Sequence, residues 1–223
     1  MVQREKNKKL KAGILKLGFG NSNSVVSLFK KIGCEVFIIE KKNQFKNIDI
    51  LAIMGHGNFD FVMKKMIKKN LLKIIKEHIY SNKMYIGICL GAQILCNKSD
   101  ESLIPGMKII NADVKKITTT KKNKVPHIGW NSVNVKKNIS WLKKFDKLDF
   151  YFAHSYFLKF KDKKSENDLE IMYSNYSNKV PTLVKFKNAY GLQFHPEKSY
   201  SNGLELIKEI IKNGFKKKSY SKH

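Results

Sequence analysis

The sequence predicts an α/β fold with a mixed, mainly parallel central sheet flanked by helices. In the first half, short apolar runs alternate with longer segments in which apolar residues recur at helical spacing. Strands that are separated by helices pair in parallel, because each helix carries the chain back to the starting end of the sheet. In the second half, several strand-like runs follow one another with few helical segments between them, which predicts a mixed or antiparallel extension of the sheet.

The elements of the first half are delimited by glycines and by changes in apolar spacing. A glycine-rich turn over 18–21 separates the first strand from the first helix, and Gly33 ends that helix. Asp60 is the expected N-cap of the next helix. The predicted elements are a strand over 12–17, a helix over 22–33, strands over 35–39 and 48–54, a helix over 60–80 and a strand over 84–88.

The second half is predicted to be rich in strands and to close with a helix over 203–213. The strand-like runs span 107–114, 149–157, 169–174, 182–186 and 190–194. No internal repeat or linker divides the chain, so we expect a single domain over 12–215, a basic N-terminal extension over 1–11 and a basic C-terminal tail over 216–223.

Composition limits the classes of function. The 223 residues contain no run of eighteen apolar residues and no secretory signal, so we expect neither a membrane span nor membrane binding. The three cysteines show no metal-like spacing, which favours a reducing, cytoplasmic location and argues against a disulfide framework or a zinc site. The net charge of +26 comes from lysines in nearly every polar segment, a pattern more typical of solvated faces than of a nucleic-acid site.

The most informative segment is GICLG, residues 87–91. A buried strand that ends in Gly-x-Cys-x-Gly and turns at once into a helix has the form of a nucleophile elbow, in which the central side chain is exposed. The turn places Cys89 at a helix N-terminus, which favours the thiolate, and leaves the amide of Leu90 to stabilise an oxyanion. The alternative is an inert buried cysteine at the end of a core strand.

A second strand end supplies partners for a thiol nucleophile. In GLQFHPEKS, residues 191–199, the strand delivers His195, Pro196 stiffens the turn, and Glu197 follows two residues after the histidine. A nucleophilic thiol needs a base, and a histidine base needs an acceptor that orients it. Taken alone, His195 fits a surface turn and Glu197 a solvated charge, but the joint occurrence of the two motifs favours a Cys-His-Glu triad.

These motifs resemble a known family. GICLGAQ over 87–93 and QFHPEKS over 193–199 are similar to the two signatures of the class I, triad-type glutamine amidotransferases. The segments PHIGWN at 126–131 and YFAHSY at 151–156, with the Gly-Asn loop near the N-terminus, resemble the glutaminase subunits of imidazole glycerol phosphate synthases. The resemblance covers roughly 12–215 and implies the flavodoxin-like fold of that family.

The resemblance assigns roles to the triad. It implies that Cys89 attacks the side-chain amide of glutamine, that His195 passes a proton to the leaving ammonia, and that Glu197 orients His195. A glutamyl thioester forms and water releases glutamate from it. Gln93 matches the family position that helps to hold the substrate glutamine; without the motif it would be interpreted as a partly exposed helix residue. No cofactor and no metal are implied.

The loop after the third predicted strand resembles the family segment that completes the oxyanion hole with backbone amides. The usual Pro-Gly-Val-Gly is replaced here by Met54, Gly55, His56 and Gly57. Both glycines that permit a peptide flip are retained, whereas the proline is lost and histidine stands in place of valine. The departure leaves open how tightly resting activity is suppressed and whether His56 contacts a ligand or a partner. A second departure, Ala92 in place of methionine, is a packing change.

Further residues match family positions that face a partner, a (β/α)8-barrel synthase subunit with which the chain would form a heterodimer. Ammonia near neutral pH is mostly protonated in bulk water, so it is useful only if a sheltered path delivers it to the partner. The alternative for Trp130 and Tyr151 is that they simply fill the core. The expected interface residues are Pro126, His127, Trp130, Asn131, Tyr151 and Lys198.

Three functions follow, in order of preference. The first is a glutaminase subunit that supplies ammonia for imidazole glycerol phosphate formation in histidine biosynthesis. The second is a paralogue that feeds ammonia to the amidation of a surface sugar, with the altered oxyanion loop as its only support. The third is a non-catalytic, basic binding protein, against which the intact triad argues.

Overall fold

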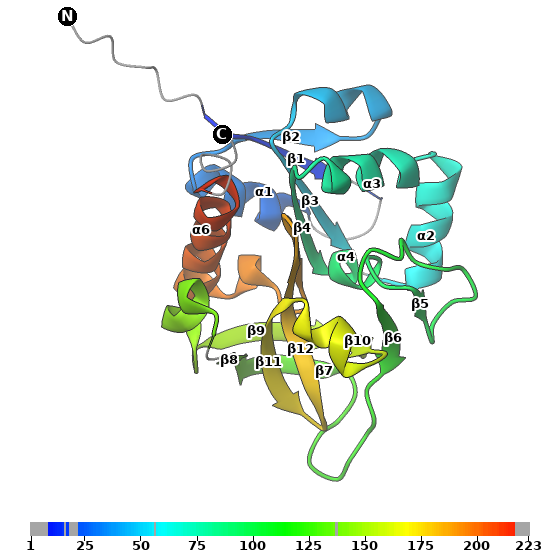
Figure 1. Ribbon diagram of the computed structural model, residues 1–223, viewed down its shortest axis with the longest axis vertical. Coiled ribbons are helices and arrows are strands. Elements are labelled where there is room, and N and C mark those ends of the chain that lie inside the picture. The colour runs from blue at the N-terminus through cyan, green and yellow to red at the C-terminus, as the bar shows by residue number, and fades with distance from the viewer. Residues whose placement is uncertain (1–8, 16, 18–21, 56, 137, 217–223) are drawn as a thin grey trace, which may run out of the picture.

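The computed structural model describes residues 9–15, 17, 22–55, 57–136 and 138–216. Within these residues the central sheet has eight strands in the order β2-β1-β3-β4-β13-β12-β11-β8 (Figure 1). Its strands are β2 (Glu35–Ile39), β1 (Lys11–Leu15), β3 (Ile50–Gly55), β4 (Met84–Cys89), β13 (Ala189–Leu192), β12 (Asn178–Phe186), β11 (Glu170–Tyr176) and β8 (Asn134–Val135).

The sheet changes from parallel to antiparallel at β13, as the sequence predicts. The strands from β2 to β13 pair in parallel, while β13, β12, β11 and β8 pair in antiparallel fashion. The parallel strands β3 and β4 are buried along their whole length, which explains their continuous apolar character. The mixed, mainly parallel α/β architecture is therefore confirmed.

Helices cover both faces of the sheet (Figure 1). One face carries α1 (Ser22–Lys31), the 3₁₀ turns η2 (Ser140–Phe145) and η3 (Pro196–Lys198), and α6 (Tyr200–Lys216). The other face carries α2 (Phe59–Lys68), α3 (Leu72–Tyr80) and α4 (Leu90–Gln93). The apolar side chains divide into two main clusters, one on each side of the sheet, because alternate residues of each strand point to opposite faces.

Smaller elements lie beside the antiparallel end of the sheet. A three-stranded sheet joins β10 (Tyr156–Phe160), β6 (Ala112–Lys116) and β5 (Lys98–Ser99), and a two-stranded ribbon joins β7 (His127–Ser132) to β9 (Asp149–His154). In the ribbon His127 lies opposite His154, and Trp130 lies opposite Tyr151. The remaining short elements are η1 (Lys42–Asn47) and α5 (Lys163–Asn167).

Three predicted elements differ from the structure. The expected helix over 60–80 is broken into α2 and α3, because Asn70 adopts a positive φ of 51°, a conformation that ends a helix and that asparagine tolerates. The N-cap of α2 is Asn58, whose side chain accepts from the amide of Phe61, rather than Asp60. The expected strand over 149–157 divides at Ser155 between the ribbon and the three-stranded sheet, and the strand expected over 107–114 begins at Ala112.

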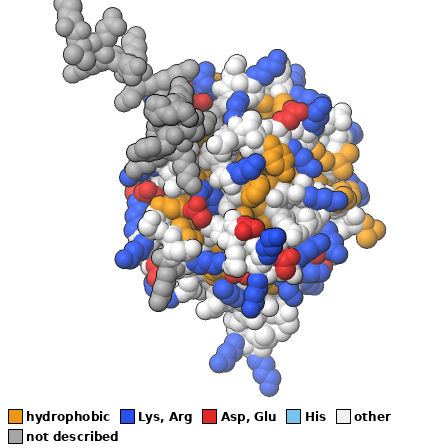
Figure 2. Space-filling view, in the orientation of Figure 1, with side chains coloured by type: hydrophobic (Ala, Val, Ile, Leu, Met, Phe, Trp, Pro, Cys, Tyr) orange, Lys and Arg blue, Asp and Glu red, His pale blue; other side chains and the backbone are white. Residues whose placement is uncertain are grey.

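Several expectations fall on residues outside the described ranges. These are the Gly-Asn loop within 18–21, His56, and most of the basic extension and tail. Among the helices described, none is both long and apolar enough to cross a membrane. Lysine side chains are spread over the face shown in Figure 2, with acidic and apolar side chains among them.

Close backbone packing holds α4 against the parallel strands β3 and β4. A Cβ atom added to Gly91 would lie 2.0 Å from the carbonyl oxygen of Ile53, and one added to Gly87 would lie 2.3 Å from the carbonyl oxygen of Gly91. Both neighbours are backbone atoms, so neither can move aside as a flexible side chain would. The glycines at these two positions therefore allow the turn from β4 into α4.

We expect Gly91→Ala to lower the free energy of unfolding by about 2 kcal/mol, within the range measured for overpacked cores. Urea denaturation followed by circular dichroism measures the change. Gly191→Ala is the matched control, because its added methyl group would meet the side chain of Ala92 at 3.1 Å rather than a backbone atom. Equal costs for the two variants would contradict this account of the turn.

Candidate active site

Cys89 occupies the turn between β4 and α4 in a conformation that few non-glycine residues adopt. Its φ is 53° and its ψ is −109°, and a backbone of this kind is costly by about 1–3 kcal/mol unless its surroundings enforce it. The thiol borders a cavity, and 8% of the residue is exposed. The structure thus places Cys89 as the nucleophile elbow requires, with its side chain outside the helix that follows.

His195 and Glu197 lie beyond the end of β13, which pairs in parallel with β4 so that Leu192 lies opposite Ile88. Pro196 begins the turn η3, and this turn brings the carboxylate of Glu197 back to the imidazole. The Nδ1 atom of His195 donates to Oε1 of Glu197 at 2.8 Å, and both side chains are fully buried. The other ring nitrogen, Nε2, is left to face Cys89.

Strand β9 fixes the backbone around His195. The amide of His195 donates to the carbonyl oxygen of Tyr151 at 2.8 Å. The hydroxyl of Ser199 donates to the carbonyl oxygen of His195 at 2.7 Å and accepts from the amide of Tyr151 at 3.0 Å. These contacts hold both ends of the turn, so the imidazole has little freedom to move away from the sulfur.

Electrostatics favour a protonated imidazole. Burial alone would lower the pKa of His195, but its hydrogen bonds and charge interactions with Cys89 and Glu197 outweigh burial and raise that pKa to about 9. An imidazolium held between a sulfur and a carboxylate is the charge distribution of a thiolate–imidazolium pair. The arrangement therefore provides a nucleophile and, beside it, a proton for a leaving group.

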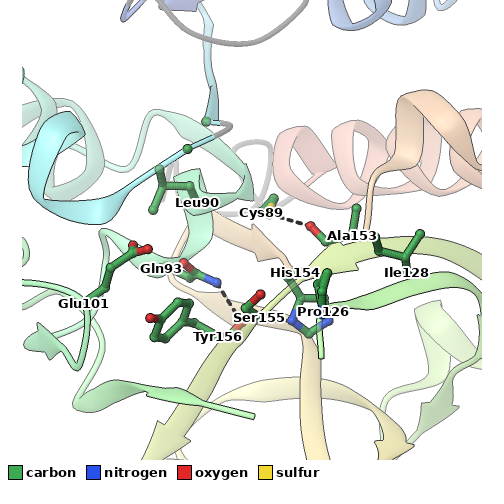
Figure 3. A pocket seen from close by; sticks show the side chains of 12 residues that line it. Cys89, Leu90, Gln93, Glu101, Pro126, Ile128, Ala153, His154, Ser155 and Tyr156 are labelled. Carbon is green, nitrogen blue, oxygen red and sulfur yellow. Dashed lines mark hydrogen bonds between the residues drawn. The ribbon is translucent and has the colours of Figure 1, made fainter. Parts of the chain in front are cut away.

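A cavity of about 330 Å³ opens above the sulfur, large enough for a ligand of amino-acid size (Figure 3). Its lining comes from the elbow, the end of β3, the loop after β5 and the ends of the β7–β9 ribbon. The lining residues are Gly55, Gly57, Cys89, Leu90, Gln93, Glu101, Pro126, Ile128, Ala153, His154, Ser155 and Tyr156.

Two groups contact the sulfur from the protein side. The sulfur of Cys89 lies 3.9 Å from the carbonyl oxygen of Ala153, to which the neutral thiol form donates, as the dashed line in Figure 3 marks. The side-chain amide of Gln193 donates to the sulfur at 3.7 Å. An amide donor stabilises a thiolate, so Gln193 supports the charged form of the nucleophile.

Gln93 and Glu101 present acceptors to the same cavity. The amide nitrogen of Gln93 donates to the carbonyl oxygen of Tyr156 at 2.9 Å and to Oε1 of Gln193 at 3.2 Å. Both amide hydrogens of Gln93 are thus used, and its carbonyl oxygen is the atom that it offers to a ligand. Glu101 accepts from the amide of Phe59 at 2.6 Å and adds a carboxylate to the cavity wall. Two acceptors, one of them charged, suit a cationic group such as an ammonium.

The predicted oxyanion segment lies beside the nucleophile. Gly55 ends β3 opposite Cys89, and a Cβ atom added there would lie 2.8 Å from the Cβ of Leu90. Gly57 has a φ of 110° and is exposed. Leu90, whose amide was predicted as an oxyanion donor, is the first residue of α4. His56 lies outside the described residues.

The residues predicted to face a partner divide between the two faces of the β7–β9 ribbon. Trp130, 47% exposed, packs edge-on against Tyr151 at 5.9 Å between ring centroids, and the ammonium of the exposed Lys198 lies 5.5 Å from the Tyr151 ring. Pro126 is exposed at the rim of the cavity. His127 is 3% exposed, and the side chain of Asn131 contacts its ring on the inner face.

Other residues of the site were missed by sequence reasoning. Gln193 precedes the FHPE segment and His154 lies within YFAHSY, but neither motif indicates a role for these two side chains. Glu101 follows Cys89 by twelve residues and lies in no recognisable pattern. Tyr200, 81% exposed, stacks on Trp130 at 5.4 Å and extends its aromatic surface. In the described part of the chain, no group of three potential metal ligands comes together.

The sequence is similar to proteins of one family. The sequence matches the family Glutamine amidotransferase class-I over residues 14–217. It is 37% identical to the imidazole glycerol phosphate synthase subunit HisH of Caldanaerobacter subterraneus subsp. tengcongensis, over 90% of this chain and 98% of that protein. It is 34% identical to the corresponding HisH of Staphylococcus aureus, over 91% of this chain and 97% of that protein.

Solved structures share the fold. A structure described as a glutamine amidotransferase superposes with a TM-score of 0.72 at 15% identity, covering 92% of this chain and 98% of that one. The structure of PurLQS from Thermotoga maritima gives a TM-score of 0.67 at 16% identity, covering 92% of this chain and 99% of that one.

We expect the imidazole of His195 to titrate near pH 9 in the isolated chain, followed by NMR of ¹⁵N-labelled histidine. Because Cys89 and Glu197 both raise this pKa, Cys89→Ala and Glu197→Gln should each lower it, and the cysteine variant should lower it more. The buried neutral His127 serves as the internal reference, since neither substitution touches its partners. A His195 resonance that titrates near pH 6.5 in the unaltered chain would contradict the buried pair.

Proposed function

Because the chain belongs to the class-I glutamine amidotransferase family, we propose that it hydrolyses glutamine to glutamate and ammonia. It does so as the glutaminase subunit of an imidazole glycerol phosphate synthase, in histidine biosynthesis, as the names of its HisH relatives indicate. The observation that carries this assignment to particular residues is the strained Cys89 at the floor of an amino-acid-sized cavity, beside the His195–Glu197 pair.

The first half of the reaction forms a thioester. The thiolate of Cys89 attacks the side-chain carbonyl carbon of glutamine and gives a tetrahedral intermediate. The proton at Nε2 of His195 passes to the amide nitrogen, the carbon–nitrogen bond breaks, and ammonia leaves. Glu197 stabilises the imidazolium before the transfer and holds its ring in place throughout.

The second half regenerates the enzyme. His195, now neutral, takes a proton from a water molecule as the water attacks the thioester carbonyl. The carbon–sulfur bond of the second tetrahedral intermediate then breaks, so glutamate leaves and the thiolate–imidazolium pair is restored. In both halves the oxyanion lies near the amide of Leu90 and the segment 55–57, whose glycines suit a backbone that supplies donors.

The acceptors of the cavity select the amino-acid end of glutamine. Glu101 and the carbonyl oxygen of Gln93 bind the α-ammonium group, because a carboxylate paired with an ammonium forms a charge-assisted hydrogen bond. The apolar part of the substrate chain then runs from these residues to the sulfur. A substrate that lacks the α-ammonium group leaves the half-buried carboxylate of Glu101 without its partner, so it binds weakly.

The ammonia is delivered to a partner synthase subunit, which we propose to be a (β/α)8 barrel that docks on the outer face of the β7–β9 ribbon. Support for this surface is its exposed apolar and aromatic character: Ile128 is 63% exposed and Trp130 47%, with Tyr200 stacked on the tryptophan. Lys198 adds a positive charge at its edge. Residues 12–215 form the amidotransferase domain in this proposal.

We expect Cys89→Ala to reduce glutamine hydrolysis by the complex with its synthase partner at least about a thousandfold, since loss of a nucleophile removes the covalent route. Ammonia or glutamate release measures the effect. Cys34→Ala is the matched control, because Cys34 lies outside the cavity, and it should retain full activity. A glutamine-analogue alkylator should label Cys89 and neither Cys34 nor Cys96. Hydrolysis that survives Cys89→Ala would refute the assignment of the nucleophile.

We expect Glu101→Gln to raise the KM for glutamine about 10- to 100-fold, with a smaller change in kcat, because it removes a charge-assisted bond to the substrate. The side chain that this substitution introduces at position 101 still offers an oxygen to the amide of Phe59. Steady-state kinetics with glutamine measures the split. Asp60→Asn makes the same change of charge on α2, where Asp60 contacts Lys64 and Ser102 outside the cavity, and should leave KM unchanged. Equal effects of both substitutions would show a general loss of negative charge instead.

A further inference from the structure

A continuous chain of buried and partly buried hydrogen bonds connects the β7–β9 ribbon to the substrate cavity. The amide nitrogen of Asn131 lies 3.5 Å from Nε2 of His127, and Nδ1 of His127 lies 3.1 Å from Nε2 of His154. Nδ1 of His154 lies 2.9 Å from the carbonyl oxygen of Tyr156. That same oxygen accepts from Gln93 at 2.9 Å, so the chain reaches a residue of the proposed glutamine site.

The direction of every bond in the chain follows from its two ends. At the cavity end, the carbonyl oxygen of Tyr156 only accepts, so Nδ1 of His154 carries the proton and, in a neutral ring, Nε2 accepts from Nδ1–H of His127. At the ribbon end, the amide nitrogen of Asn131 also donates to the carbonyl oxygen of Asn175 at 3.3 Å, which identifies it as the donor toward Nε2 of His127. Both ends therefore require that Nδ1 of each histidine ring donates and that Nε2 of each ring accepts.

The surroundings keep both rings neutral. His127 is stacked between Phe152 at 4.6 Å and Tyr176 at 3.7 Å between ring centroids. Burial lowers the pKa of His127 to about 4. Burial, then the neighbouring His127, lowers the pKa of His154 to about 3, although its bond to Tyr156 opposes this shift. At neutral pH each histidine has one ring proton, and the geometry places that proton on Nδ1.

The chain continues past Gln93 to the nucleophile. Gln93 donates to Oε1 of Gln193, which orients the Gln193 amide so that its nitrogen donates to the sulfur of Cys89. A displacement of the Tyr156 carbonyl therefore alters the position of Gln93 and the donor that faces the sulfur. His154 borders the cavity, but its ring makes no described hydrogen bond to Cys89 or Gln93. The link from its ring to Gln93 runs through the carbonyl oxygen of Tyr156.

We propose that His127 and His154, both as Nδ1–H tautomers, form a one-way hydrogen-bond relay from the inner face of the ribbon to Gln93, and that His154 is a positioning residue for glutamine. This relay rests on the proposed function, since Gln93 is its glutamine-binding end. The outer face of the same ribbon carries Trp130 and Tyr151. A partner that docks there thus contacts the element whose inner face sets the affinity for substrate.

The tautomers test the relay directly. In the full chain labelled with ¹⁵N-histidine, alone and bound to the synthase partner at neutral pH, both rings should show a protonated Nδ1 and an unprotonated Nε2, which is the less common form of free histidine. The variants His127→Asn and His154→Asn assign the two resonances among the six histidines of the sequence. A protonated Nε2 on either ring would overturn the relay.

Kinetics of glutamine hydrolysis by the complex tests the consequence. His154→Leu removes both bonds and should raise KM for glutamine about fivefold, the effect of one lost hydrogen bond, with kcat within about twofold. His154→Asn places an amide nitrogen near the position of Nδ1, keeps the bond to Tyr156, and should restore KM to within about twofold. Tyr176→Phe, which keeps the ring on His127 and loses only a bond to Lys124, is the matched control and should leave both constants unchanged.

The outcomes separate the two proposals. Equal KM values for the leucine and asparagine variants, or a fall in kcat alone, would overturn the positioning role of His154 and leave it a packing residue. Absence of glutamine hydrolysis by the unaltered complex would refute the proposed function instead. The tautomer measurement needs no activity, so it still decides whether the relay exists.

Discussion

Parallel pairing of β13 with β4 brings together the two segments on which the site depends. Leu192 lies opposite Ile88, so the chain leaves both strands at the same end of the sheet, at Cys89 on one side and Gln193 to His195 on the other. Residues separated by 106 positions in the sequence thereby meet at one edge of the sheet. The edge at which parallel strands end is where α/β sheets bind their ligands, and here it carries Cys89, His195 and the cavity, which are the nucleophile, the base and the substrate site of the proposed function.

The turn at Cys89 concentrates strain in that edge. A residue with a positive φ persists only if its neighbours enforce it, and here the enforcement is backbone packing of Gly87 against α4 and of Gly91 against β3. The same packing fixes the first amide of α4 relative to the sulfur. The helix α4 spans only four residues, Leu90–Gln93, so its dipole is weak. The rigid turn therefore contributes more than the dipole to the placement of the sulfur and the first amide of α4.

Sequence reasoning predicts those parts of the protein that rest on local pattern. The strands of the parallel half, the elbow and the FHPE turn each have a signature within ten residues, and the mixed sheet follows from the order of elements. Asn70 breaks a segment whose apolar spacing is helical throughout, because a single backbone conformation outweighs that periodicity. Glu101, Gln193 and His154 are brought to the site by tertiary contacts, so no spacing in the sequence identifies them as members of one network.

The ribbon β7–β9 shows why a docking surface and a buried network occur on one element. Side chains alternate between the faces of a strand, so PHIGWN places Ile128 and Trp130 outward while His127 and Asn131 point inward. A contiguous motif of this kind suggests one interface, although half of its side chains face outward and the others face the interior. Because the two sets share a backbone, a rigid shift of the ribbon moves both together, and the buried bond between His127 and His154 is costly to lose. Contact on the outer face is therefore coupled to hydrogen-bond geometry on the inner face.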